Sequence, residues 1–149
     1  MRAFDHDYVV EVVRRVERVK PFANPAWGTL TPPEMVGHLV ETLRYSMGRG
    51  EPYEDVGSWF TKHVLRRLLR WGLLRIPKNI QAPRAPGMGP RPRPSDSETL
   101  HAVLEEYLGL VQAGELTPVQ HPILGNLDVD EWARLHVLHT EHHLRQFGV

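Results

Sequence analysis

Hydrophobic residues recur along several stretches of the chain at the three- and four-residue spacing of an amphipathic α-helix. The clearest stripe is made of five valines near the start: Val9, Val12, Val13, Val16 and Val19. We expect this helix to end at Lys20-Pro21, because proline cannot continue a helix. The alternation typical of strands is weak throughout, so the pattern predicts an all-α protein.

Helix-start signals mark three further helices. Thr31-Pro32-Pro33-Glu34 is a capping box with proline in the first turn, and the helix after it should end between Gly48 and Pro52. A second capping box, Ser95-Asp96-Ser97-Glu98, precedes another apolar stripe, and Asp128-Val129-Asp130-Glu131 opens the last helix in the same way. The simplest assembly of four such amphipathic helices is a four-helix bundle.

A basic helical segment, from about residue 58 to 74, differs from these helices in charge. Residues 62–93 contain nine Lys or Arg and no Asp or Glu, and six of the 13 prolines lie between residues 77 and 94. We expect this segment to pack at one side of the bundle, followed by a Pro-rich connection without helix or strand. The prediction is one domain over residues 1–149, an all-α four-helix bundle with this additional segment.

Composition narrows the classes of function. The 18 basic residues balance the 18 acidic ones, which argues against nucleic-acid binding through a uniformly basic surface. Cysteine is absent, which excludes disulfides, a thiol nucleophile and cysteine-based metal sites, and fits a cytoplasmic location. The first residues form no apolar run and no stretch reaches the length of a membrane span, so we expect neither a signal peptide nor a membrane partner.

Histidines make the last predicted helix the most informative element, since four of the nine lie between residues 136 and 143. At 100° per residue, one face of this helix collects Trp132, Leu135, His136, His139, His143 and Gln146. The two apolar members indicate that the face points into the bundle. His38 has a comparable position on the helix that follows Thr31.

Two of these histidines have a spacing that suits a metal ion. His139 and His143 are four residues apart, so their imidazoles can hold one divalent cation. A third ligand from a facing helix would leave a coordination position open for water or substrate, as in catalytic sites. The competing interpretation is a set of hydrogen-bonded core histidines, and for His38 taken alone that interpretation is favoured. Spacing by itself leaves both open.

Three segments carry recognisable motifs. Residues 27–38 contain T-x-x-x-M-x-x-H, residues 121–127 read H-P-x-x-G-x-L, and residues 132–147 end in H-x-x-H-H-x-x-Q-F. Together they resemble the DinB/YfiT-like superfamily of metal-dependent enzymes, and the second motif and the final Q-F resemble a branch of unknown function. The resemblance spans most of the chain, with the basic and Pro-rich middle as the divergent part.

The resemblance implies a four-helix bundle, often a homodimer, with zinc or nickel bound by three histidines. Carried over by position, the ligands are His38, His139 and His143. His142 is then a neighbour that does not bind the metal, and Gln146 lies one turn beyond the last ligand.

Other side chains have weaker links to the site. His136 is not required by the motif, and we expect a core residue or a proton shuttle rather than a fourth ligand, which would close the site. Trp27 and Trp132 are candidates for a pocket wall, although core packing is the commoner role. Glu41 is the nearest candidate for a general base after His38, but a solvated glutamate is the favoured interpretation. The base therefore stays unassigned.

Characterised relatives in the superfamily include transferases and isomerases that use a low-molecular-weight thiol. The resemblance thus implies a metal-dependent transferase, isomerase or hydrolase for a small-molecule substrate, in which the cation lowers the pKa of a bound thiol or water. The alternative is a non-catalytic bundle that holds a metal or ligand and acts through partners.

The basic segment suggests a third hypothesis, in which it binds anionic lipid, nucleic acid or an acidic partner. Residues 62–75 alternate basic and apolar side chains, as a surface-seeking helix does. The favoured interpretation packs its leucines on the bundle and its arginines against acidic residues. Lys62, Arg66 or Arg84 would alternatively attract an anionic substrate, and Trp59 and Trp71 would cover the bundle or a dimer contact.

Overall fold

The computed structural model describes residues 2–81 and 83–149, and within them the regular structure is helical. The elements are α1 (His6–Glu17), α2 (Pro32–Ser46), the π-helical turn η1 (Thr61–Leu65), α3 (Arg66–Arg70), α4 (Ser97–Ala113) and α5 (Val129–Gln146). The predicted all-α class and its four longer helices are confirmed. None of the described helices is long and apolar enough to cross a membrane.

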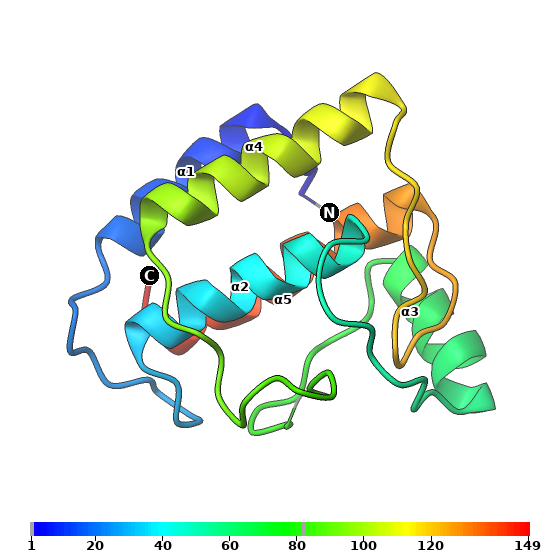
Figure 1. The fold of residues 1–149 in the computed structure, drawn as a ribbon, viewed down its shortest axis with the longest axis horizontal. Coiled ribbons are helices and arrows are strands. Elements are labelled where there is room, and N and C mark those ends of the chain that lie inside the picture. The colour runs from blue at the N-terminus through cyan, green and yellow to red at the C-terminus, as the bar shows by residue number, and fades with distance from the viewer. Residues whose placement is uncertain (1, 82) are drawn as a thin grey trace.

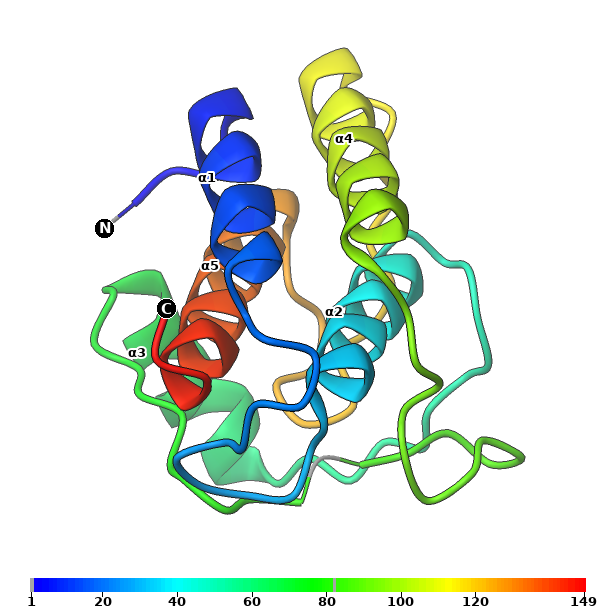
Figure 2. The same cartoon turned by 90° about the vertical axis from the view of Figure 1, so that its left-hand side faces the viewer.

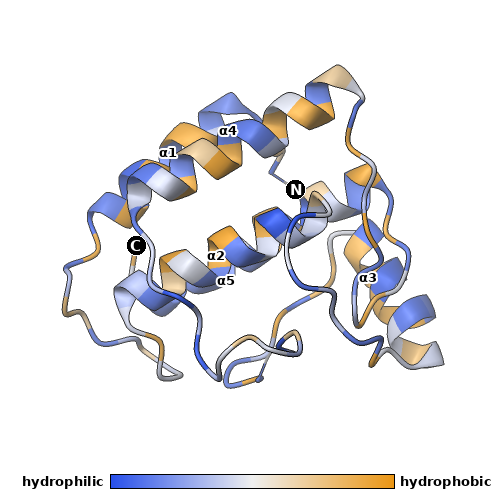
Figure 3. Ribbon diagram, in the orientation of Figure 1, coloured by the Kyte–Doolittle hydropathy of each residue, from blue (hydrophilic) through white to orange (hydrophobic). Residues whose placement is uncertain are grey.

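The four longer helices enclose one main core. Figures 1 and 2 show α1 beside α4 in one layer and α2 beside α5 in the other, and α1 and α4 also contact helices of the second layer. Val9, Val12 and Val16 of α1 are buried there with apolar side chains of α2 and α4. Figure 3 shows hydrophobic and hydrophilic residues alternating around the helices, the amphipathic pattern that drives such packing.

The helix starts follow the capping signals, with one shift. The predicted boxes at Thr31 and Asp128 are both formed, each with its reciprocal glutamate contact. The predicted box that starts at Ser95 is wrong. Asp96 is the N-cap, and its carboxylate accepts a hydrogen bond from the Thr99 amide at 2.7 Å. Serine and aspartate are comparable N-caps, and the extended backbone at Asp96 places that residue at the cap position.

The basic segment packs beside the bundle, against α5 (Figure 1). Leu69 is buried in a second, smaller apolar cluster that includes Trp132. Arg66 and Arg70 both pair with Glu131, whose side chain is buried. The favoured interpretation of the segment, with leucine on the bundle and arginine on acidic partners, therefore describes this side of it.

The Pro-rich connection lies directly against α2. A side chain at Gly37 would meet the carbonyl oxygen of Arg93 at 1.7 Å, so only glycine allows this approach. Arg84 in the same connection donates to the Glu41 carboxylate at 3.0 Å. Arg91 pairs in the same way with Glu34 at 2.6 Å, so a close backbone approach and two ion pairs hold this irregular segment against α2.

Candidate metal centre

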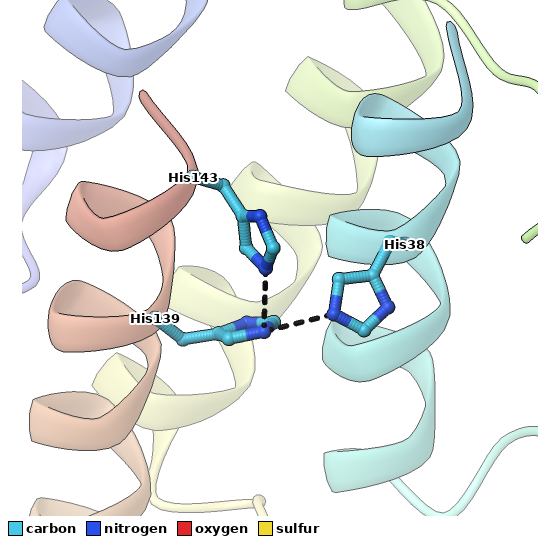
Figure 4. Close-up of side chains that lie close together, drawn as sticks. All are labelled: His38, His139 and His143. Atoms are coloured by element: carbon cyan, nitrogen blue, oxygen red, sulfur yellow. Dashed lines mark hydrogen bonds between the residues drawn. The ribbon is translucent and has the colours of Figure 1, made fainter. Parts of the chain in front are cut away.

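Three imidazoles from two helices meet inside the bundle (Figure 4). The Nε2 atom of His139 lies 2.9 Å from Nε2 of His38 on α2 and 3.1 Å from Nε2 of His143 on α5. One ligand nitrogen from each residue lies within 4.8 Å of the others. Bonds of about 2.0–2.1 Å place neighbouring ligands of a tetrahedral zinc ion about 3.3 Å apart, so the three nitrogens nearly fit one coordination sphere.

Local structure explains why these side chains converge. His139 and His143 lie one turn apart on α5, so their rings project from the same side of the helix. His38 lies between two buried residues, Met35 and Leu39, on the side of α2 that packs into the bundle. The contact between α2 and α5 then brings the third ring to the other two.

Burial keeps the three imidazoles neutral. It lowers the pKa of His38 to about 3 and that of His143 to about 4, against an ordinary value near 6.5. Burial and the neighbouring rings also lower the pKa of His139 well below that value. Neutral imidazole is the form that binds a metal ion, so the cluster is in the competent state around neutral pH.

Gln146 determines which nitrogen of His143 carries the proton. The Gln146 side-chain amide donates to the carbonyl oxygen of Trp27 at 2.7 Å, so its Oε1 atom faces Nδ1 of His143 at 2.8 Å. An amide oxygen only accepts, and the proton of His143 is therefore on Nδ1. This leaves a lone pair on Nε2, the atom that faces the other histidines. Metal-binding histidines are commonly oriented by such a hydrogen bond.

The two short contacts cannot both be hydrogen bonds between neutral rings. They share one atom, Nε2 of His139, which holds either a proton or a lone pair. Because Nε2 of His143 has no proton, Nε2 of His139 has to be the donor in that contact. It then has no lone pair to accept from His38, and its single proton points to one neighbour. A cation that takes all three lone pairs satisfies the whole cluster.

His136 is placed in the core instead. The Ser46 hydroxyl donates to a backbone carbonyl at 2.7 Å, so it accepts from Nε2 of His136 at 2.8 Å. The His136 ring stacks on Trp132, with ring centroids 5.4 Å apart. The Trp132 indole in turn donates to the carbonyl oxygen of Val119. Both residues therefore line the core and not the three-histidine cluster.

Glu41 is engaged by the Pro-rich connection. Its carboxylate accepts from Arg84 at 3.0 Å and from the backbone amide of Arg93 at 3.2 Å, and its side chain is 15 % exposed. The interpretation of Glu41 as a solvated residue is therefore wrong. The Arg84 charge contributes to the low pKa of His38, so this ion pair lies near the histidines.

The other expected cations have partners elsewhere. Lys62 donates to Asp55 at 2.6 Å, and Arg66 is bound to Glu131. Of the three basic residues expected at the site mouth, only Arg84 influences a histidine of the cluster. The sequence did not predict that Arg84 pairs with Glu41, because apolar residues have no regular spacing in the Pro-rich connection.

Sequence reasoning missed the surroundings of His142. Its Nε2 atom accepts from the Trp27 indole at 3.4 Å, and the Lys78 ammonium lies 4.5 Å above that indole ring. Trp27 thus touches the site twice, through its carbonyl to Gln146 and through its side chain to His142. The H-P-x-x-G motif is structural, since Nδ1 of His121 accepts two backbone amides of its own turn.

A protein-family model described as "Protein of unknown function (DUF1569)" matches residues 3–148. The match covers nearly the whole chain, including the three histidines of the cluster. No curated protein matches the chain, and no solved structure matches it. Function has to be argued from the geometry.

Proposed function

The chain belongs to the DUF1569 family, a DinB/YfiT-like family of proteins of unknown function, and we propose that it is a metal-dependent enzyme. His38, His139 and His143 hold one divalent cation, zinc or nickel, and a small-molecule substrate reacts beside it. Imidazole nitrogen suits both metals.

One observation carries the proposal. Nε2 of His139 lies within 3.1 Å of Nε2 atoms on two other histidines, and neutral imidazoles satisfy only one of these contacts. The donor set is uncharged, with His143 buried and His38 and His139 partly buried, and its convergent nitrogens contact only one another. These properties fit a divalent cation better than they fit a group of core histidines, for which His136 provides the contrast.

Three protein ligands leave room for an exogenous ligand, and the bound cation would lower the pKa of a water or thiol there. Because the chain has no cysteine, the thiol would come from a low-molecular-weight cofactor. The chain contributes orientation: Gln146 holds the His143 ring, and the Trp27 carbonyl holds Gln146. A reaction of the transferase, isomerase or hydrolase type fits this division of roles.

The state of Glu41 favours a second candidate function. The carboxylate nearest to His38 along α2 is bound to Arg84, so it is not free to accept a proton from substrate. A bundle that binds a metal or ligand without catalysis, and acts through partners, needs no such base. The two functions differ in whether the cation has a coordination position at which water can be exchanged for substrate.

Metal analysis of untagged protein tests the proposal. We expect about one zinc or nickel ion per chain by mass spectrometry, and its loss in the double variant His139→Ala, His143→Ala. The matched control is His6→Ala, His101→Ala, which removes two exposed histidines from other helices and should keep the ion.

Two outcomes would count against this function. A protein that binds neither zinc nor nickel after reloading has no metal centre. If the visible spectrum of cobalt-substituted protein does not change when thiols or anions are added, the cation has no open coordination position. That result supports the non-catalytic alternative. A spectrum that responds to a thiol justifies a screen of thiols against electrophiles.

A further inference from the structure

The side of the basic segment that faces away from the bundle exposes large apolar groups. Within the described residues, six of the eight exposed large hydrophobic side chains lie between residues 56 and 80. Trp59 is 71 % exposed and Trp71 is 64 % exposed. Soluble surfaces rarely gather aromatic residues in this way without a binding role.

The two tryptophans flank a histidine and an arginine along one side of the helix. Trp59, His63, Arg67 and Trp71 follow one another at four-residue intervals across η1 and α3. The Trp59 and His63 rings stack with centroids 5.0 Å apart, and the Arg67 guanidinium lies 5.9 Å from the centre of the Trp71 ring. We call these four residues, with the exposed Phe60 and Leu73, the aromatic–basic surface.

The opposite side of the helix fixes this orientation. Leu69 is buried, and the Arg66 guanidinium donates three hydrogen bonds of 2.8, 3.0 and 3.1 Å to the Glu131 carboxylate. Turning the segment to cover Trp59 or Trp71 would break this buried ion pair and expose Leu69. These contacts hold the aromatic–basic surface on the outward side of the segment.

We propose that the aromatic–basic surface docks on an anionic lipid membrane. Tryptophan prefers the interface between headgroups and acyl chains, and basic residues are attracted to anionic headgroups. The surface supplies both, because Arg67 and the nearby Arg75 are exposed and form no ion pair among the described residues. Lys62, Arg66 and Arg70 are instead paired with Asp55 or Glu131. Such docking is peripheral and needs no membrane-spanning helix, so it agrees with the lengths of the described helices, but it departs from the sequence-based expectation of no membrane partner.

Charge and stacking argue against two other occupants. A symmetric contact between two copies would place this cationic region against itself, which is repulsive. Single-stranded nucleic acid binds by stacking its bases on aromatic faces, but here His63 already stacks on Trp59 and Arg67 lies over Trp71. Phe60 and Leu73 add apolar groups that suit lipid rather than bases.

Vesicle flotation tests the proposal. We expect the protein to float with phosphatidylcholine vesicles that contain about one part in three phosphatidylglycerol, and not with phosphatidylcholine alone. Trp59→Ser with Trp71→Ser, or Arg67→Glu alone, should weaken binding at least about tenfold. Added salt should weaken binding of the parent protein.

The matched controls change similar groups elsewhere on the surface. Phe22→Ser removes a phenylalanine that is 95 % exposed between α1 and α2, and Lys20→Glu reverses an exposed charge nearby. Both should bind as the parent does, and circular dichroism should show every variant folded. The double variant His139→Ala, His143→Ala should also bind, which separates this inference from the metal centre.

Three results would overturn the proposal. The first is a parent protein that stays with the buffer when anionic vesicles float at low salt. The second is flotation that the tryptophan and arginine variants share with the parent. The third is Trp59- and Trp71-dependent binding to oligothymidine, or self-association in sedimentation, without binding to vesicles.

Discussion

His136 and His143 lie about two turns apart on α5, and both side chains are buried, with 2 % and 8 % exposed. Nε2 of His136 has a hydroxyl partner on Ser46, and its ring stacks on Trp132. Nε2 of His143 instead faces His139. One end of the helix therefore uses histidine as a core residue, and the other end leaves lone pairs directed at one point.

The difference shows that burial does not identify a metal ligand. Burial lowers the pKa of both His136 and His143, so both are neutral. What separates them is the partner of the nitrogen that points inward. In His136 the inward nitrogen donates to the Ser46 hydroxyl. In His143 the outer nitrogen donates to the side-chain oxygen of Gln146, so the inward nitrogen carries no proton and cannot donate. Four experiments test this contrast.

The largest effect should come from His139→Ala, which removes the nitrogen shared by both short contacts. We expect at least about a thousandfold loss of zinc or nickel affinity, or roughly 4 kcal/mol. The metal-free protein should stay folded, because only the hydrogen bond between His139 and His143 is lost and His139 is partly exposed. Competition with a chelator measures the affinity. A variant that kept its metal would show that His139 is a core residue like His136.

His136→Ala should produce the converse result. Removing the ring leaves a cavity beside Trp132 and a Ser46 hydroxyl without its donor, which should lower the free energy of unfolding by about 2–4 kcal/mol. Metal affinity should not change. Urea denaturation of metal-free protein measures the first quantity. Loss of metal by the folded variant would place His136 among the ligands.

Gln146→Leu tests the orienting hydrogen bond. Without the amide oxygen, His143 is free to carry its proton on Nε2, and metal affinity should fall about 10–100-fold. The control is Arg145→Gln, a change at the exposed neighbouring position. Titration with zinc compares the two variants. Equal affinities would mean that Gln146 serves only the loop at Trp27.

The smallest effect concerns pH. The pKa of His136 is lowered to about 3 in the folded protein, while the unfolded chain takes up the proton near 6.5. Stability must therefore fall as pH drops below about 6.5, and the loss from this residue ends only near its folded pKa. His136→Gln keeps the donor to Ser46 but cannot titrate.

Metal-free wild-type protein should lose more stability between pH 7 and pH 6 than His136→Gln does, by less than about 1 kcal/mol. Denaturation in the two buffers measures the difference. Parallel pH dependences would show that His136 is already protonated or solvent-accessible in the folded protein.

Sequence periodicity predicted the helices and brought three histidines to one face of α5, but it could not separate His136 from the others. A helical wheel describes one helix, whereas the partner of His136 is Ser46 on α2. The motif resemblance supplied the set with His38, and the structure brings those three rings together.

Two features lay beyond sequence reasoning for a related reason. Arg84, the partner of Glu41, lies in an irregular segment. Such a segment has no regular spacing of apolar residues from which the direction of a side chain could be predicted. The start of α4 was placed one residue early, because Ser95 and Asp96 are both good caps and only the backbone conformation distinguishes them.

Gly28 links the loop after α1 to the histidines. It has a positive φ of 74°, and a Cβ atom there would lie 2.8 Å from the side-chain nitrogen of Gln146. Any larger residue at position 28 would displace the amide that orients His143. A shorter side chain at position 146 would remove the clash but not the strain of a positive φ, and it would lose the amide that orients His143. A substitution more than 100 residues before the last two ligands in the sequence would therefore affect the geometry of the metal centre.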